Sequence, residues 1–214
     1  MMIQDWMKYL DPLLKLYGKR KHPLNYKNRY QLLIMVILSA QDSDKHINEL
    51  AENFFNVYPS LEFLAKALPK DLHQYIGSVR NFGNKSEWIV KLAKTISCDD
   101  KIPTTLDDLI KLPGIGRKSA NVIIRESGTK AEGIIVDLHV IRVAPRIGIA
   151  TGVQPERIEK QIMAIVPQEK WNEVGMAISF LGREICRPTN PNCNICVMNV
   201  VCNYYNELAK RPAI

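Results

Sequence analysis

Two sets of residues in this 214-residue chain could do chemistry. Four cysteines stand close together near its end, and a lysine in a glycine-rich segment is followed by an aspartate nineteen residues later. The cysteines are Cys186, Cys193, Cys196 and Cys202, and the other pair is Lys118 and Asp137. Grouped thiolates suit a metal centre, whereas an amine with a carboxylate suits nucleophilic and electrostatic catalysis.

The lysine closes the segment LPGIGRK, residues 112–118. Pro113 predicts a turn after a helical pattern, and Gly114 and Gly116 can adopt positive φ and let another backbone approach. The apolar spacing over 117–126 then indicates a second helix. The free N–H groups and the dipole at the start of that helix favour an anion. The segment therefore predicts a helical hairpin that binds a nucleic-acid phosphate.

Lys118 and Asp137 each allow two interpretations. At the start of a helix the dipole disfavours a charged lysine, which favours the neutral amine that a nucleophile requires. A solvated lysine that touches phosphate is the alternative. Asp137 ends an apolar run over 134–136 and precedes another helical pattern, so it is either an N-cap or a buried functional carboxylate.

The cysteine segment has the spacing C-x6-C-x2-C-x5-C. In an intracellular protein thiols stay reduced, so a metal site is favoured over disulfides. Zinc sites more often use two short C-x2-C knuckles, and this segment has only one. Cys98 lies apart from the other four and is expected to be an ordinary packed thiol.

Three segments together resemble the endonuclease III branch of the helix-hairpin-helix DNA glycosylases. They are LPGIGRKSANVI followed by VDLH, LSAQDSD at 38–44, and the cysteine segment, and they occur in the family's order over nearly the whole chain. The resemblance implies an all-α fold of two helical domains with a DNA cleft between them. It implies a six-helix domain with the hairpin at 22–133, and a discontinuous domain with a C-terminal iron–sulfur loop at 1–21 and 134–214.

The resemblance also implies an activity, a cofactor and a partner. The activity is that of a base-excision-repair glycosylase and abasic-site lyase, acting on oxidised pyrimidines, with Lys118 forming the Schiff base and Asp137 assisting it. The four cysteines would hold a 4Fe-4S iron–sulfur cluster. The partner would be double-stranded DNA with damaged bases or abasic sites, bound by a monomer. The residues expected to contact DNA are Gln41, Asn81, Leu112, Gly114, Ile115, Gly116, Arg117 and His139.

Several positions depart from the family's pattern. Arg80 and Asn81 stand where the family usually has a small residue and an apolar wedge, so we expect a shifted lesion or opposite-base preference. A neutral loop variation is the alternative. Leu138 replaces a usual threonine, which could leave more of the capping to Asp137. Pro145 is expected to kink or end a helix.

Other site residues also have competing interpretations. Gln41 follows a buried helix and is expected to occupy the space left by an extruded nucleotide, although a solvent-exposed loop residue is the alternative. Asp42 and Asp44 are expected to cap a helix that begins near Lys45. For His139, structural packing competes with a DNA contact.

Composition and charge agree with a nucleic-acid partner. The formal net charge is +7, which favours an acidic partner. The first 17 residues do not resemble a signal peptide, and the apolar helix expected over 31–40 is too short to span a bilayer, so we expect a cytoplasmic protein without a membrane partner.

Two other functional classes remain as alternatives. A monofunctional mismatch- or adenine-directed glycosylase is disfavoured by Lys118, and the chain ends too soon after Cys202 for the extra domain of the adenine branch. A non-catalytic, cluster-containing DNA-binding module is disfavoured because both Lys118 and Asp137 are present.

Overall fold

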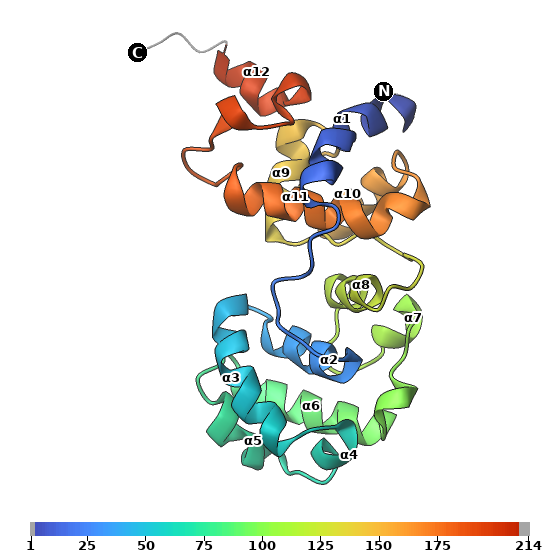
Figure 1. The fold of residues 1–214 in the computed structure, drawn as a ribbon, viewed down its shortest axis with the longest axis vertical. Helices are drawn as coiled ribbons and strands as arrows, with labels where there is room; N and C mark the ends of the chain where they lie inside the picture. The colour runs from blue at the N-terminus through green and yellow to red at the C-terminus, as the bar shows by residue number, and fades with distance from the viewer. Residues whose placement is uncertain (1–2, 210–214) are drawn as a thin grey trace. The chain divides into compact units, whose positions relative to one another are not determined.

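The computed structural model describes residues 3–209, and its regular secondary structure over that range is entirely helical. The chain forms two compact units, His22–Thr129 and Met1–Lys21 with Lys130–Ile214. We call these the hairpin unit and the discontinuous unit. Figure 1 shows the helices of each. The all-α prediction is confirmed, and no helix among the described residues is long and apolar enough to cross a membrane.

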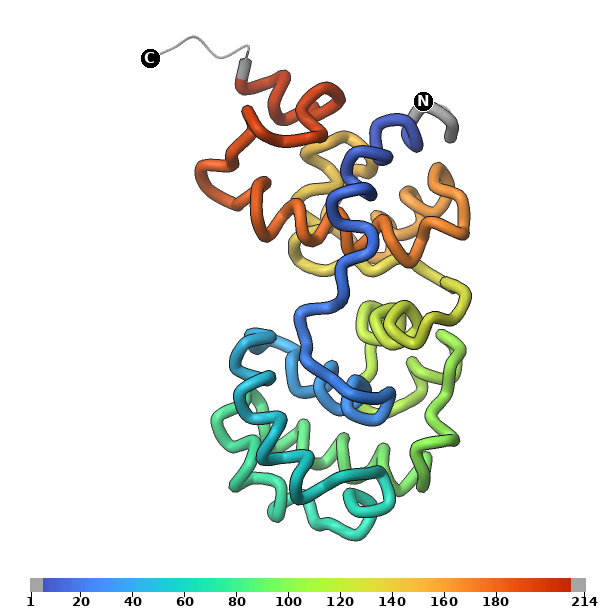
Figure 2. Tube along the Cα trace, in the orientation of Figure 1, coloured from blue at the N-terminus to red at the C-terminus, as the bar shows by residue number. Residues whose placement is uncertain are grey.

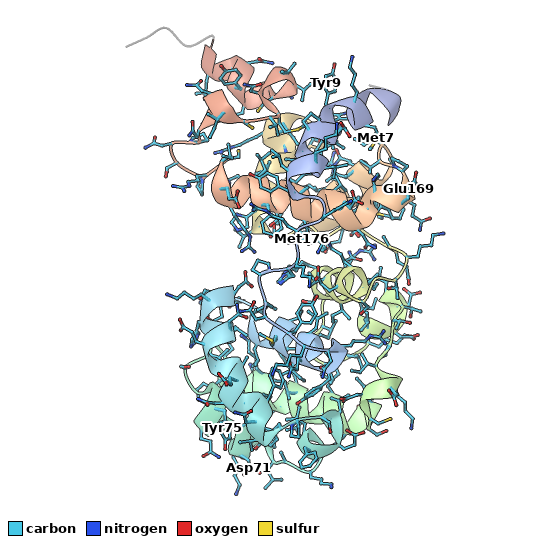
Figure 3. The ribbon with its side chains drawn as sticks, in the orientation of Figure 1. Met7, Tyr9, Asp71, Tyr75, Glu169 and Met176 are labelled. Carbon is cyan, nitrogen blue, oxygen red and sulfur yellow. The ribbon has the colours of Figure 1, made fainter. Side chains whose placement is uncertain are left out.

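The hairpin unit is built around one apolar helix. Its helices are α2 (Arg29–Leu38), α3 (Asp44–Val57), α4 (Leu61–Leu64), α5 (Pro69–Ile76), α6 (Phe82–Ile96), α7 (Leu106–Leu109) and α8 (Arg117–Glu126), with a 3-10 turn at Asp99–Lys101. Residues 32–38 of α2 are all buried, and α2 packs against α3, α6 and α8. Figure 3 shows Asp71 and Tyr75 on α5. The Tyr75 ring packs nearly perpendicular to the rings of Phe54 on α3 and of Tyr58, the C-cap of α3.

The N-terminus of α3 differs from the prediction. Ser43 is the N-cap of α3, and its hydroxyl accepts a hydrogen bond of 3.1 Å from the His46 N–H. The predicted caps Asp42 and Asp44 are therefore wrong, because Asp42 lies one residue too early and Asp44 is already helical. α7 is only four residues long, because the turn of the hairpin begins directly after it.

The discontinuous unit joins the N-terminal helix to the C-terminal segments. Its helices are α1 (Ile3–Tyr17), α9 (Leu138–Ile147), α10 (Pro155–Met163), α11 (Trp171–Glu184) and α12 (Asn203–Ala209), with 3-10 turns at Gln168–Lys170, Cys193–Ile195 and Asn199–Val201. α11 lies at the centre and packs against α1 and α9. Figure 2 shows the blue N-terminal segment beside the orange one of α11. The side chains of Trp6, Leu10 and Leu13 on α1 are buried.

Pro145 does not end its helix, so that form of the prediction is wrong. It lies inside α9, which continues to Ile147. The C-cap of the helix is Gly148, whose φ is 88°. Proline lacks the N–H that would bond back to the carbonyl four residues earlier. The helix therefore lacks one backbone hydrogen bond near its end, and the Gly148 N–H closes it by donating to the carbonyls of Ala144 at 3.1 Å and Pro145 at 3.2 Å.

Candidate active site and four-cysteine loop

The hairpin turn depends on Gly114. Its φ is 78°, and a Cβ built on it would lie 2.9 Å from Trp88 Cε3 and 3.4 Å from Ile37 Cγ2. Both the backbone conformation and the packing therefore require glycine at this position. Gly116 is different, because its φ is −92° and a Cβ there would meet nothing within 4 Å. The prediction of positive φ is wrong for Gly116, whose missing side chain instead leaves open space at the start of α8.

The other hairpin residues divide into buried and accessible ones. The side chains of Leu112 and Ile115 are 8% and 5% exposed, and the Ile115 N–H donates to the Leu112 carbonyl at 3.2 Å. Their side chains hold the turn in the core. Arg117 and Lys118 are half-buried at the first two positions of α8, whose N-cap is Gly116. The first N–H groups of a helix have no partner within that helix, so this end of α8 suits an anion.

Asp137 is the N-cap of α9. Its Oδ1 accepts hydrogen bonds of 2.9 Å from the N–H groups of His139 and Val140, and its Oδ2 accepts one of 2.6 Å from the Ser179 hydroxyl. An ionised carboxylate can accept about four hydrogen bonds. Three donors reach Asp137 among the described residues, which leaves Oδ2 with acceptor capacity. The half-buried carboxylate is thus a helix cap that could also face a developing positive charge.

Close packing of the segment before Asp137 against α11 fixes the position of this N-cap. A Cβ on Gly175 of α11 would lie 2.5 Å from the Ile135 carbonyl oxygen, so only glycine lets the preceding apolar segment lie against α11. One turn further along α11, the Ser179 hydroxyl reaches Asp137 from a fully buried position. The Ile134 N–H donates to Glu159 Oε1 at 3.0 Å and fixes the start of the segment. Ser179 was missed by sequence reasoning, although a hydroxyl on the apolar face of a helix was a usable signal.

His139 is held by its own unit. Its Nδ1 lies 3.2 Å from Arg142 Nη2, and the same nitrogen of Arg142 donates to the carbonyls of Gly182 at 2.9 Å and Cys186 at 3.2 Å. This network supports the packing role for His139, and its contact with DNA stays a prediction.

The four cysteines line one pocket, together with apolar side chains of α9 and α11. None of them is in a disulfide. Among the described residues no three His, Cys, Asp or Glu side chains surround a site for a single ion. Thiolates bound to one zinc ion lie about 2.3 Å from it, so they must crowd together. Four free thiols on one pocket are the donor set that an iron–sulfur cluster requires.

Arg146 holds the cysteine loop against α9. Its guanidinium donates to the carbonyls of Arg187 at 2.8 Å and Pro188 at 3.1 Å, and lies 4.4 Å from the centre of the Tyr204 ring. Burial raises the pKa of Cys196 to about 11 and also raises the pKa values of Cys193 and Cys202. Thiolates here therefore need a cationic partner, which a metal centre supplies.

Gln41 and Asn81 lie on exposed loops of the hairpin unit, and both adopt positive φ, 61° and 56°. Behind them is Lys85, a buried lysine that the sequence analysis did not single out. Its Nζ donates to the carbonyls of Leu38 and Ala40 at 2.7 Å each. A lysine on the buried face of the following helical pattern was the available signal.

Comparison with known proteins places this architecture in a family. Residues 34–168 match the model of the "HhH-GPD superfamily base excision DNA repair protein". The endonuclease III of Rickettsia felis is 38% identical over 190 residues, covering 87% of this chain and 88% of that protein. The endonuclease III of Bacillus subtilis is 35% identical over 210 residues, covering 96% and 94%.

Solved structures agree with these relatives. A non-covalent endonuclease III–DNA complex superposes with a TM-score of 0.87 at 31% identity, covering 99% of this chain and 100% of that one. A trapped endonuclease III–DNA covalent intermediate has a TM-score of 0.87 at 30% identity, covering 98% and 100%. The chain therefore belongs to the HhH-GPD superfamily of base excision DNA repair proteins and, within it, to the endonuclease III family.

Proposed function

We propose that this protein is a bifunctional DNA glycosylase and abasic-site lyase that repairs double-stranded DNA, with Lys118 as its nucleophile. One observation carries the assignment: a half-buried lysine stands at the second position of α8, next to the N–H groups of a glycine-capped hairpin. The related structures support it, since one is an endonuclease III–DNA complex and another a trapped covalent intermediate with DNA.

The reaction assigns a role to each part of the site. The N–H groups at the start of α8 bind a phosphate, and the damaged nucleotide rotates out of the stack. The neutral Lys118 amine bonds to the sugar C1′, while the bond from C1′ to the base breaks and its electron pair leaves with the base, which takes up a proton. The Asp137 carboxylate stabilises the positive charge that develops on the sugar.

The lyase steps follow from the covalent intermediate. Once the sugar ring opens, Lys118 is joined to C1′ as a Schiff base, which makes the C2′ hydrogen acidic. Loss of that proton expels the 3′ phosphate by β-elimination and cuts the strand on the 3′ side. Water then hydrolyses the Schiff base and restores the Lys118 amine.

The cofactor is proposed to be a 4Fe-4S cluster held by Cys186, Cys193, Cys196 and Cys202. The shared pocket, the free thiols and the cost of ionising them without a cation support this assignment. When bound, the cluster supplies positive charge to the thiolates and fixes their loop. That loop also carries Arg187, which could add salt-sensitive affinity for phosphate.

Oxidised pyrimidines are the proposed substrates, and the Asn81 loop is proposed to shift the lesion or opposite-base preference. Asn81 is exposed and can hydrogen-bond to a base edge, which an apolar wedge cannot do. Excision rates opposite each of the four bases, measured for wild type and Asn81→Leu, test this point. An unchanged profile would contradict it. The bacterial relatives support a cytoplasmic location, and we propose that the protein acts as a monomer.

Borohydride trapping on two duplexes tests the function itself. One duplex carries an abasic site and the other thymine glycol. We expect a covalent adduct with both, and its loss in Lys118→Gln. No adduct with either duplex would favour a non-catalytic DNA-binding protein. An adduct with the abasic duplex alone would keep the lysine chemistry and mean that the lesion preference differs.

A further inference from the structure

We infer that Asp42, His46 and Lys85 brace the two loops that carry Gln41 and Asn81, so that both side chains enter the DNA as one rigid unit. We call these residues the brace, and the loops, residues 39–43 and 77–81, the Gln41 loop and the Asn81 loop. The inference rests on the proposed function, because it assigns positioning residues to that site.

The Asp42 carboxylate joins the two loops directly. Its Oδ2 accepts a hydrogen bond of 3.2 Å from the Arg80 N–H in the Asn81 loop. Its Oδ1 accepts bonds of 2.8 Å from the Ser43 N–H and from the His46 ring at Nδ1. Since an ionised carboxylate can only accept, Nδ1 must carry the hydrogen.

His46 extends this link to a second point on the Asn81 loop. Its Nε2 lies 3.0 Å from the Ser78 hydroxyl, which donates to it when the ring is neutral. Asp42 lies just before the N-cap Ser43, and His46 lies in the first turn of α3, so the carboxylate meets the ring from outside the helix end.

Lys85 joins the same loops from beneath. Its side chain is 2% exposed, and its Nζ donates to the Ala40 carbonyl immediately before Gln41. Its backbone N–H donates to the Asn81 carbonyl at 3.1 Å. A single buried residue therefore contacts the backbone on which each of the two DNA-facing side chains depends.

The backbone conformation of both loops shows why bracing matters. Left-handed φ is uncommon for residues other than glycine, and it persists where surrounding contacts hold it. Gln41 and Asn81 are two of four such residues in the described part of the chain, the others being Ser97 and Asn190. Residues that the brace holds adjoin both of them, since Asp42 follows Gln41 and Arg80 precedes Asn81.

A rigid pair of loops suits base extrusion. When a nucleotide leaves the stack, one side chain must fill its place while another meets the unpaired base opposite. Ordering two independent loops on binding costs conformational entropy twice, whereas a braced pair is already positioned. The brace touches neither the sugar nor Lys118, so its members act as positioning residues.

The first test compares base excision with cutting at a preformed abasic site. The variants are Asp42→Ala and Ser78→Ala, and the matched control is Glu49→Ala, an exposed residue of α3 that pairs with Lys45 at 3.9 Å. Under single-turnover conditions we expect Asp42→Ala to slow excision of thymine glycol about tenfold but β-elimination less than about twofold, because an abasic site has no base to unstack. Ser78→Ala should show a smaller selective loss, and Glu49→Ala none.

The second test measures coupling between the loops. Gln41→Ala and Asn81→Ala are made singly and together, in the wild-type and Asp42→Ala backgrounds. We expect their effects on excision to be non-additive in wild type and additive without the brace. Amide hydrogen exchange at Arg80 should be faster in Asp42→Ala, and Asp42→Asn, which keeps one acceptor oxygen, should recover part of the excision rate.

Several outcomes would overturn the brace. These are equal non-additivity in both backgrounds, parallel loss of excision and β-elimination in Asp42→Ala, or a comparable loss in Glu49→Ala. Wild-type protein that fails to cut abasic DNA would contradict the proposed function instead. In that case the exchange rate at Arg80 still decides whether Asp42 joins the loops.

Discussion

The two catalytic candidates are built in different ways. Lys118 stands on a hairpin whose geometry comes from its neighbours in sequence, since Gly114, Gly116 and the bond from Ile115 to Leu112 all lie within six residues of it. Asp137 depends on residues far along the chain, because Ser179, 42 positions away, holds its second oxygen. A short motif can therefore specify the nucleophile's position, whereas the carboxylate's position requires a packed domain.

The largest expected effects distinguish a catalytic role from a structural role for Lys118 and Asp137. Lys118→Gln should reduce strand cutting by at least about a thousandfold, because it removes the nucleophile, while leaving the melting temperature nearly unchanged. Asp137→Asn should also lower the rate, yet keep α9 stable, since asparagine is a good N-cap. Asp137→Ala should additionally lose about 1 kcal/mol of stability. Single-turnover cutting and thermal melts measure both, and an equally destabilised Asp137→Asn would show that the carboxylate is mainly structural.

Loss of the proposed cluster should damage the discontinuous unit selectively. Cys196→Ser is expected to lose iron and to melt at a lower temperature, because a bound metal centre stabilises the fold that binds it. Cys98→Ser is the control and should keep its iron. Iron and sulfide analysis with melting curves makes the comparison, and full iron content in Cys196→Ser would contradict the assigned ligands.

Substitution of Gly114 should disrupt the hairpin turn. Gly114→Ala must adopt a φ of 78° and also push against Trp88, so we expect weaker DNA binding and a stability loss above the roughly 1–2 kcal/mol that left-handed backbone costs. Gly128→Ala is the control, because it has a φ of 70° but open space around its Cβ. Urea unfolding and DNA titration measure the two effects. Equal losses in both variants would mean that the contact with Trp88 contributes nothing.

A smaller effect tests how Asp137 is held. Ser179→Ala removes a hydrogen bond to a charged group, worth about 1.5–3 kcal/mol, so we expect kcat to fall about tenfold with little change in KM. Leu138, 67% exposed beside Asp137, offers a place to restore a hydroxyl. Adding Leu138→Thr to Ser179→Ala should recover part of kcat. A fall in stability without any recovery would reduce Ser179 to a packing role.

The smallest effect concerns pH and the brace. Burial tends to raise the pKa of Asp42, but hydrogen bonds from His46, Ser43 and Arg80 outweigh it and hold the pKa below 3.8. The unfolded state therefore binds more protons between the folded pKa and 3.8, so this stabilisation is complete above that range and is lost as the pH falls through it. The difference in melting temperature between wild type and Asp42→Asn should be largest above pH 4 and shrink at lower pH. A difference independent of pH would contradict the linkage.

Signals that act over a few residues were enough to predict much of this protein. An apolar run identified the buried helix α2. The glycine segment and the cysteine spacing, with the family resemblance, led to the fold and family that the comparisons establish. Such signals succeed because turns, caps and helix faces are decided by neighbouring side chains.

Other features depended on tertiary contacts. Asp42 accepts a hydrogen bond from the Arg80 N–H, Lys85 is buried beneath two loops, and Ser179 reaches Asp137 from a different helix. In each case a polar group found its partner on a segment distant in sequence, and burial made that partner necessary, because an unpaired polar group inside a protein costs free energy. No local pattern shows which distant carbonyl or carboxylate will be near, so only the folded chain decides those pairings.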